Sequence, residues 1–314
     1  MSRYEEVDLA NVRTYSVTQR HSKVHHQAVA RPHRRGDFFE SFYKSLPDVL
    51  IGRDLRELVE RIIGARARQK PVILMMGAHV VKVGLSPIVV DLMERGIVTG
   101  VASNGASIVH DTELALFGET SEEVAEGLAD GSFGMAVETA EFINNAVKGA
   151  RSEALGLGEA VGRAINQQSR ANATLSILAC GDRCNLPVTI HVGIGTDIIH
   201  QHSSMDGAAY GELSFRDFKI LSREVMDLND GGVLLNIGSS VLMPEVFLKA
   251  LTIARNVHPP VNNFFTANFD MIMHYRPRVN VVQRPTLQGG KGYNFIGHHE
   301  IMLPLLAAAI KEFI

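Results

Sequence analysis

Residues with small or hydroxyl-bearing side chains follow an apolar segment of this chain and could hold an anion. The apolar run Val233–Ile237 leads into Gly238-Ser239-Ser240, and a helix with Pro244 in its first turn follows. Backbone N–H groups at a helix N-terminus are free to bind an anion, and only small residues let a ligand approach the backbone closely. We therefore expect a ligand at the end of this strand, as in other open α/β sheets.

The same arrangement recurs at residues 76–87, 102–111, 191–197 and 266–270, where an apolar stretch gives way to small, hydroxyl or acidic residues. Backbone amides suit a pyrophosphate and an acidic side chain suits a ribose, so the junctions together favour a dinucleotide site. A glycine at any single junction can instead serve only a tight turn. The chain also lacks the Gly-x-Gly-x-x-Gly fingerprint, so spacing alone does not identify the ligand.

Six segments of the chain are predicted to form β-strands, and these strands position the junctions. Most are continuous apolar runs, which is typical of strands buried on both faces by crossover helices. We predict an α/β protein with a three-layer, Rossmann-like parallel sheet of about six strands and helices on both faces. The predicted strands are Val72–Met76, Ile97–Ala102, Val188–Val192, Val233–Ile237, Asn263–Ala267 and Val279–Val282.

The domain organisation follows from changes in periodicity along the chain. Residues 1–45 show neither helical nor strand periodicity and predict an extended N-terminal arm, which could lie on a neighbouring subunit. Residues 46–314 predict a single domain. Within it, residues 106–186 repeat Ala, Glu and Leu in a pattern that indicates several helices and no strand, and this helical insertion is too long for one crossover.

Composition limits the classes of function. The 314 residues carry a formal net charge of −3, so the chain lacks the basic surplus that nucleic-acid binding needs. We expect Cys180 and Cys184 to be reduced and structural. No segment reaches the roughly twenty unbroken apolar residues of a membrane span, and the N-terminus does not resemble a signal peptide. We therefore expect a cytoplasmic protein without membrane or nucleic-acid partners.

The order of these elements resembles the deoxyhypusine synthase family from about residue 71 to the C-terminus. These NAD-dependent enzymes transfer the aminobutyl group of spermidine to a lysine or another amine. The segments that look like family motifs are Ser103–Ser107 with His110 and Asp111, Leu186-Pro187-Val188 followed by Thr196-Asp197, Gly238-Ser239-Ser240, Thr266–Asp270 and Pro304-Leu305-Leu306.

The resemblance implies an NAD site at the strand ends and a homotetramer with active sites at a dimer interface. It implies that a hydride passes from an amine, or another small substrate, to NAD and that Lys291 captures the resulting imine. Glu245, His202 and His298 are expected to face the substrate. The implied cofactor-binding residues are Ser86, Ser103, Asn104, Gly105, Asp111, Thr196, Asp197, Gly238, Ser239, Ser240, Thr266, Ala267 and Asp270.

Three differences from the family pattern predict an altered substrate. His202 stands where the family has an aspartate, Pro244-Glu245 replaces a histidine pair, and no tryptophan precedes Lys291. Because a polyamine needs carboxylates and an aromatic face, these differences argue against spermidine. A solvated loop lysine is the alternative interpretation of Lys291.

Two other classes of function stay open. A protein without the lysine chemistry would be a non-catalytic binder of a nucleotide or sugar phosphate. Alternatively, His200, His202, His298 and Glu300 could ligate zinc or another divalent ion and support hydrolysis. We favour hydrogen-bonding histidines over ligands, because no third ligand follows at a diagnostic spacing, and we predict no metal.

Overall fold

The computed structural model describes residues 2–257 and 260–314 and divides into two compact units at Arg53 and Asp54. The first unit is mostly irregular chain that contains the 3-10 helices η1 (Leu9–Asn11), η2 (Val17–Gln19) and η3 (His26–Ala28) and the helix α1 (Phe39–Ser45). Asp8 and Ser16 cap η1 and η2 with their side-chain oxygens. The sequence predicted an extended arm as far as residue 45, whereas the structure adds these short helices and extends the unit to Arg53.

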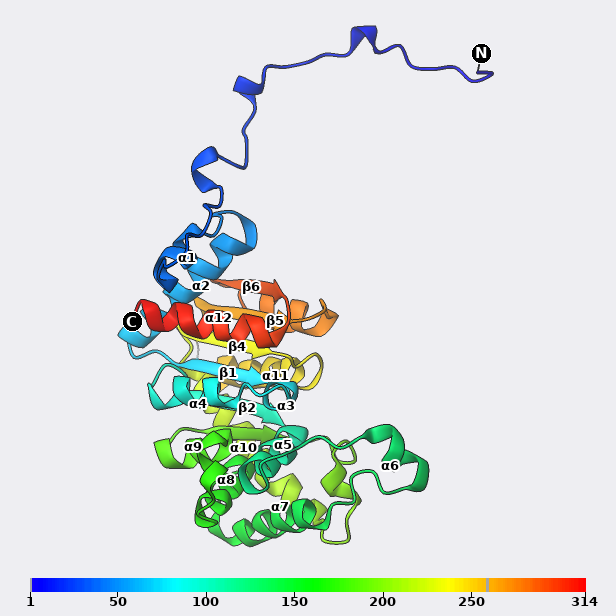
Figure 1. The fold of residues 1–314 in the computed structure, drawn as a ribbon, viewed down its shortest axis with the longest axis vertical. Coiled ribbons are helices and arrows are strands. Elements are labelled where there is room, and N and C mark those ends of the chain that lie inside the picture. Colours follow the sequence, from blue (N-terminus) through cyan, green and yellow to red (C-terminus); the bar gives the residue numbers. More distant parts are fainter. Residues whose placement is uncertain (1, 258–259) are drawn as a thin grey trace. The chain divides into compact units, whose positions relative to one another are not determined.

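The second unit is built on one sheet of six parallel strands (Figure 1). Because all neighbouring strands are parallel, their carboxyl ends meet at one edge, which we call the C-terminal edge. The sheet order is β3-β2-β1-β4-β5-β6. The strands are β1 (Val72–Met76), β2 (Gly100–Asn104), β3 (Val188–His191), β4 (Val233–Ile237), β5 (Phe264–Asp270) and β6 (Gly290–Ile296).

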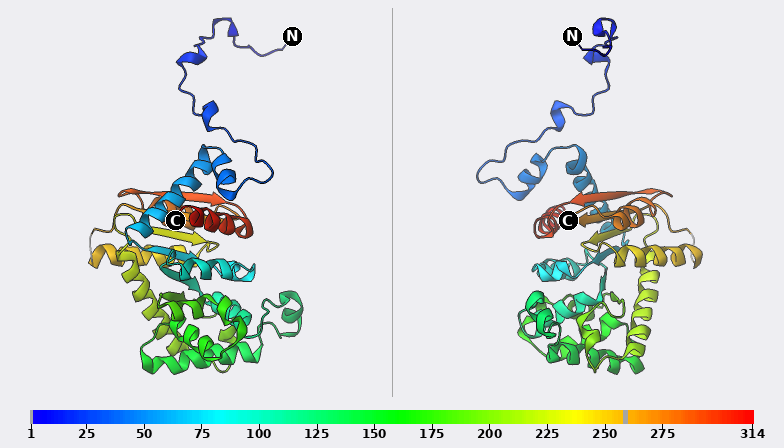
Figure 2. Two further views of the ribbon diagram at one scale, coloured as in Figure 1. Left: turned by 60° about the vertical axis from the view of Figure 1, so that its left-hand side comes forward. Right: turned by 90° about the vertical axis from the view of Figure 1, so that its right-hand side faces the viewer.

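Helices cover both faces of this sheet. Figure 2 shows α4 (Ser86–Glu94) and α12 (His299–Glu312) on one face and α10 (Gly207–Met226) and α11 (Leu242–Val257) on the other. The predicted three-layer, Rossmann-like α/β fold is therefore confirmed. The remaining helices are α2 (Leu50–Ala67), α3 (His79–Lys82), α5 (Gly105–Leu116), α6 (Val124–Asp130), α7 (Val137–Ala150), η4 (Arg151–Glu153), α8 (Leu157–Gln167), η5 (Ala171–Leu175), α9 (Ile177–Cys184), η6 (Ile198–Gln201) and the π-helical η7 (Pro277–Gln283).

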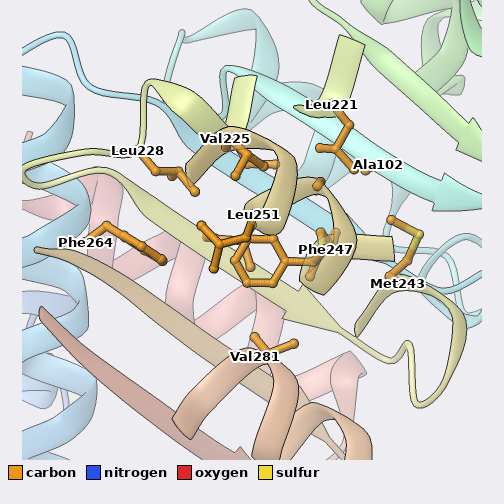
Figure 3. Packing of buried hydrophobic residues seen from close by; sticks show 14 of the residues in the cluster. Ala102, Leu221, Val225, Leu228, Met243, Phe247, Leu251, Phe264 and Val281 are labelled. Carbon is orange, nitrogen blue, oxygen red and sulfur yellow. The ribbon is translucent and has the colours of Figure 1, made fainter. Parts of the chain in front are cut away.

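A hydrophobic core fixes the sheet to α10 and α11 (Figure 3). Phe247 and Leu251 of α11 pack against Leu221 and Val225 of α10 and Phe264 of β5, and each of these side chains is at most 3% exposed. Burying one such side chain stabilises the fold by about 1.5–3 kcal/mol. This packing holds the strands that present the C-terminal edge.

Most strand predictions agree with the structure. β1 and β4 have the predicted bounds, β3 is one residue shorter, and β5 continues to Asp270. β2 starts three residues later than predicted, because the amides of Ile97 and Val98 donate to the carbonyl of Leu92 in the turn after α4. Between β2 and β3 the chain, which is described throughout, forms α5 to α9 with η4 and η5 and no strand.

The prediction of a strand at Val279–Val282 is wrong. These residues lie in η7, where the amide of Arg284 donates to the carbonyl of Val279, five residues earlier. Three β-branched residues gave the segment a strand-like composition, but Pro277 stands at the start of a helix, a position that proline favours. The sixth strand is instead β6. Its glycines and half-exposed polar residues do not form the continuous apolar run by which the other strands were predicted.

The two cysteines lie on α9 as free thiols, with their sulfur atoms 3.7 Å apart. In the described part of the chain, no helix is both long and apolar enough to span a bilayer.

Candidate functional site

The ends of β1 and β4 form the centre of the candidate site. The chain runs from β1 outward to β2 and β3 and then returns to β4 on the other side of β1, and such a reversal is where open α/β sheets bind ligands. The amide of Gly77 donates to the carbonyl of Ile237 at 3.0 Å. A Cβ atom at Gly77 would lie 2.3 Å from the carbonyl oxygen of Gly238, so only glycine fits there. We call this place the switch point.

The turn after β4 has the geometry that the sequence predicted. Gly238 adopts a left-handed conformation with φ of 66°. The hydroxyl of Ser239 accepts a hydrogen bond from the amide of Met243 at 3.2 Å and thereby caps the first turn of α11. The turn therefore places Ser239 and Ser240 at a helix N-terminus on the C-terminal edge.

A buried histidine from the last helix joins the switch point. A Cβ atom at Gly238 would lie 2.7 Å from Nε2 of His299, and the rings of His299 and His79 are 5.7 Å apart. Burial lowers the pKa of His299, and its Nδ1 has no hydrogen-bond partner among the described residues. The sequence singled out His298, but that side chain is exposed at the N-cap of α12, and its neighbour His299 is the one that faces Gly238.

Asp270 presents a carboxylate at the end of β5. The side chain is 6% exposed, its Oδ1 accepts a hydrogen bond from the amide of Met271 at 2.8 Å, and its Oδ2 lies 3.9 Å from Nε2 of His274. The structure thus places Asp270 at the C-terminal edge, two strands from β1.

Polar side chains at the end of β2 hold neighbouring elements together. The hydroxyl of Ser103 donates to the carbonyl of Met76 at 2.8 Å and so ties β2 to β1. Asn104 caps α5, because its Oδ1 accepts hydrogen bonds from the amide of Ser107 at 3.2 Å and from its hydroxyl at 2.8 Å. Both residues lie at the C-terminal edge as predicted, and these groups already have protein partners.

Asp197 and His200 form a buried polar pair after β3. A Cβ atom at Gly105 would lie 1.9 Å from Oδ2 of Asp197, so glycine is required where α5 passes this carboxylate. Burial raises the pKa of Asp197 to about 6, although a hydrogen bond with Thr196 lowers it. Nδ1 of His200 accepts hydrogen bonds from the amides of Gly195 and Asp197, at 3.1 and 3.3 Å, which places the ring proton on Nε2.

Two polar atoms of this pair remain for hydrogen bonds with a ligand or water. Oδ2 of Asp197 and Nε2 of His200 are 3.9 Å apart, and neither has a hydrogen-bond partner in the described part of the chain. Burial lowers the pKa of His200, which favours its neutral form. Leaving buried polar groups unpaired costs free energy, so a ligand or water that paired them would be stabilised.

Four residues predicted to bind the cofactor are buried in the structure. Asp111 is 2% exposed, and its carboxylate accepts hydrogen bonds from the hydroxyl of Ser176 and from two amides at the start of α9. Thr266 and Ala267 lie inside β5 with no exposed surface, and Thr266 donates to the carbonyl of Val281 at 2.7 Å. Ser86 is buried as the first residue of α4, and its hydroxyl has no hydrogen-bond partner among the described residues.

Lys291 does not lie at the C-terminal edge. It is the second residue of β6 and pairs in register with Phe265 near the start of β5, so it belongs to the amino ends of the strands. Its ammonium group lies 2.9 Å from Oδ1 of Asp54 and 2.6 Å from Oε2 of Glu57. Burial lowers the pKa of Lys291, but the hydrogen bonds to Glu57 and Asp54 outweigh burial and raise it. A charged ammonium is not the nucleophile that an imine requires.

The other residues predicted to face the substrate include Glu245 and His202, and both have protein partners. Glu245, in the first turn of α11, forms ion pairs with Lys249 and, at 3.2 Å, with Arg276. His202 has its Nε2 2.8 Å from the carbonyl oxygen of Gly134. Among residues 2–257 and 260–314, no group of three or more His, Cys, Asp or Glu side chains is arranged to hold a metal ion. His200, His202, His298 and Glu300 are therefore not assembled as ligands.

The sequence interpretation missed a ladder of three asparagines across the sheet. Nδ2 of Asn236 in β4 donates to Asn268 in β5 at 2.8 Å, and Nδ2 of Asn268 donates to Asn294 in β6 at 2.9 Å. Asn236 also donates to the carbonyl of Ser239 at 2.9 Å and so fixes the turn after β4. Only Asn236 lay in a strand that the sequence predicted, where asparagine is disfavoured, because the predicted fifth strand ended before Asn268 and β6 was not predicted.

A pocket of about 700 Å³ opens beside the β2 and β3 ends. It lies between α5, the loop that carries Thr196 and Asp197, and the segment from Phe117 to Thr139. Its volume is within the range of small-molecule sites. The C-terminal edge thus has two neighbouring places for ligands: the switch point and this pocket, which we call the α5 pocket.

Comparisons with known proteins relate the chain to others through its fold. No protein-family model and no curated protein sequence matches it. A solved structure described as a "conserved putative LOR/SDH protein" from Methanococcus maripaludis S2 is similar, with a TM-score of 0.55 and 14% identity over 96% of this chain and 75% of that protein. A "putative deoxyhypusine synthase" from Entamoeba histolytica has a TM-score of 0.53 and 10% identity over 90% of this chain and 96% of that protein.

Part of a larger protein has the same architecture. Unliganded AgrE has a TM-score of 0.54 and 13% identity over 83% of this chain, but the chain spans only 32% of the length of AgrE. At identities of 10–14%, these similarities establish the fold and leave the reaction open. The chain has a Rossmann-like α/β fold that it shares with these proteins, a putative deoxyhypusine synthase among them.

Proposed function

We propose that this protein is an NAD-dependent enzyme that binds the dinucleotide at the switch point and acts on a small substrate. The observation that carries the proposal is the strand order, in which β1 and β4 are neighbours and the chain reverses direction across the sheet between them. This is the strand order of doubly wound dinucleotide-binding domains, which bind across that reversal.

The residues at the switch point fit a dinucleotide. The Gly238-Ser239-Ser240 turn stands at the N-terminus of α11, which has sixteen residues and whose backbone amides suit a pyrophosphate. Asp270 offers a carboxylate to a ribose hydroxyl, and the glycine at 77 keeps the ends of β1 and β4 in contact. When bound, NAD would supply a hydride acceptor. The chain would bind and orient the cofactor and exclude water from it.

The proposal is limited to hydride transfer and does not include aminoalkyl transfer. The family resemblance implied an imine on Lys291, but that lysine lies at the amino end of β6 with two carboxylates. An amine remains one candidate for the oxidised substrate. The same separation of Lys291 from the switch point favours the second candidate function, a non-catalytic nucleotide or sugar-phosphate binder, over a lysine-dependent transferase.

We also propose that the protein is a homotetramer, as the resemblance to deoxyhypusine synthases implies. Three consecutive apolar residues after β5 support a protein contact near the C-terminal edge: Met271, Ile272 and Met273 are 40%, 64% and 54% exposed. Soluble proteins rarely expose contiguous apolar residues without a partner.

Native mass spectrometry of the full chain with added NAD⁺ tests cofactor and assembly together. We expect a tetramer that carries up to four NAD molecules. Ser240→Asp should abolish NAD binding, because a carboxylate at the α11 N-terminus repels the pyrophosphate, and it should leave the fold intact, because an acid is favourable at that position. The matched control is Ser152→Asp in the exposed turn η4, which should bind NAD as the wild type does.

Three results would change the proposal. A protein that binds neither NAD⁺, NADP⁺ nor ADP-ribose at millimolar concentration has no dinucleotide site. NAD binding that survives Ser240→Asp places the cofactor elsewhere on the chain. NAD binding without any turnover of amines or alcohols supports the non-catalytic binder.

A further inference from the structure

The α5 pocket contains a hydrogen-bonded chain of side chains that ends at a histidine. Glu113 accepts hydrogen bonds from two threonines, from Thr139 to Oε1 at 2.9 Å and from Thr120 to Oε2 at 2.5 Å. The hydroxyl oxygen of Thr120 lies 2.7 Å from Nδ1 of His110. His110, Glu113, Thr120 and Thr139 all line the pocket.

This chain fixes the tautomer of His110. A threonine hydroxyl has one proton, and Thr120 gives it to the carboxylate of Glu113, which can only accept. The oxygen of Thr120 must then accept a hydrogen bond from His110, so the ring proton is on Nδ1. In the neutral ring, Nε2 consequently carries a lone pair.

Nε2 of His110 is free to act on a ligand. The atom has no hydrogen-bond partner within residues 2–257 and 260–314. Burial lowers the pKa of His110 below its ordinary value of 6.5, and Lys82 lowers it further, although Glu113 raises it. The ring is thus neutral near pH 7, with its lone pair available.

We propose that the α5 pocket is a substrate site and that His110 is its general base. Nε2 takes a proton from an O–H or N–H group of the bound molecule. That bond breaks with its electron pair left on the ligand, a new N–H bond forms on Nε2, and the ring becomes an imidazolium. Thr120 and Glu113 are positioning residues, because Thr120 holds the Nδ1 proton and the carboxylate behind it stabilises the charged ring.

The side chains around the pocket indicate the class of ligand. Phe117 and Phe133 provide apolar walls, whereas Glu119, Glu122 and Glu138 bring carboxylates to the lining, which includes a single lysine. An anion would be repelled by this lining. The pocket therefore fits a neutral or cationic small molecule with an apolar part and a hydroxyl or N–H group. This inference does not require NAD at the switch point.

The tautomer of His110 can be measured directly on the full chain by long-range ¹⁵N–¹H correlation NMR after labelling the histidines with ¹⁵N. His110→Gln identifies the resonances. We expect a proton on Nδ1, an unprotonated Nε2 and a pKa below 6.5. Thr120→Val should release Nδ1 and shift the proton towards Nε2, whereas Thr120→Ser should retain the wild-type tautomer. Thr174→Val, at an exposed position of η5, is the matched control.

Reactivity towards diethyl pyrocarbonate tests whether the lone pair can be reached from the pocket. Nε2 attacks the carbonyl carbon of this neutral electrophile, a C–N bond forms, and ethyl carbonate leaves. Peptide mass spectrometry should show a rate at His110 that falls several-fold in Thr120→Val and is retained in Thr120→Ser. A wild-type ring with its proton on Nε2, or a His110 that the reagent does not modify, would overturn the proposal. Neither measurement depends on NAD, so a failure of this proposal can be distinguished from a failure of the proposed function.

Discussion

Two aspartates at the C-terminal edge differ although burial affects both alike. Burial raises the pKa of Asp111 and of Asp197 to about 6. The carboxylate of Asp111 accepts three hydrogen bonds and joins α5 to α9, so both of its oxygens already have protein partners. Asp197 retains an unpartnered oxygen beside Nε2 of His200. At the scale of the residue, free hydrogen-bonding capacity and not residue type separates a structural carboxylate from a candidate ligand-binding one.

Lys291 gives a prediction at the same scale. Its side chain is 43% exposed, and partly exposed ion pairs contribute little, so Lys291→Ala should lower the free energy of unfolding by about 1 kcal/mol or less. NAD⁺ affinity should be unchanged, because the residue lies at the amino ends of the strands. Urea denaturation and calorimetric titration measure the two quantities, with Lys291→Arg as the control that keeps the ion pairs. Loss of NAD binding in Lys291→Ala would show that the lysine contributes to the cofactor site.

At the scale of the element, the asparagine ladder links the strands on one side of the switch point to the turn after β4. Asn268 is fully buried and joins Asn236 to Asn294, and Asn236 in turn donates to the carbonyl of Ser239. The ladder runs across β4, β5 and β6 at matching register positions. It therefore couples the position of the Gly238-Ser239-Ser240 turn to the strands that carry Asp270 and α12.

Removal of the central amide should destabilise these elements. Asn268→Leu leaves a donor on Asn236 and an acceptor on Asn294 without their partner, and each unpaired buried group costs about 1–3 kcal/mol. We expect a free energy of unfolding that is lower by that order, together with weaker NAD binding. Asn145→Leu on the exposed face of α7 is the matched control. Equal stability of the two variants would mean that the ladder contributes nothing measurable.

At the scale of the whole molecule, a buried carboxyl on α10 makes stability depend on pH. Asp217 of α10 is 1% exposed, and its Oδ2 accepts hydrogen bonds from the amides of Gly158 and Ile190 at 3.0 and 2.7 Å. Burial raises its pKa from 3.8 to about 7, although these hydrogen bonds lower it. The folded state therefore binds the proton more tightly than the unfolded state. The contribution is complete below about pH 4 and is lost as the pH rises towards 7.

Asp217→Asn removes this titration. The free energy of unfolding of the wild type, relative to that of the variant, should fall as the pH rises from about 4 to about 7. The free energy of unfolding of the wild type must be compared with that of Asp217→Asn at each pH, because other groups also titrate. Burial lowers the pKa of His191 to about 3, so the stability linked to His191 is lost as the pH falls. Urea denaturation across this range measures the effect, with Asp227→Asn on the surface as the control. Parallel pH curves for the wild type and Asp217→Asn would contradict it.

The sequence predicted much of the fold because the signals for buried parallel strands are local. Continuous apolar runs gave β1 and β4 with their bounds, and a small-residue turn before Pro244 gave the start of α11. β6 was missed and η7 was assigned to a strand, because an edge strand alternates polar and apolar residues and a π-helix can be rich in valine. Strand order, which depends on pairing between distant segments, could not be read from local patterns.

The candidate site, like the fold, could be predicted from the sequence only in part. The sequence by itself determined which residues follow the strands, and the structure brings Gly238, Ser239, Asp197 and Asp270 to one edge of the sheet. Only the tertiary structure decided that Lys291 lies at the opposite edge, that His299 and not His298 is buried at Gly238, and that Glu113 reaches His110 through Thr120. The reason is physical: composition and periodicity report what a segment forms, whereas hydrogen bonds between side chains depend on packing across the whole chain.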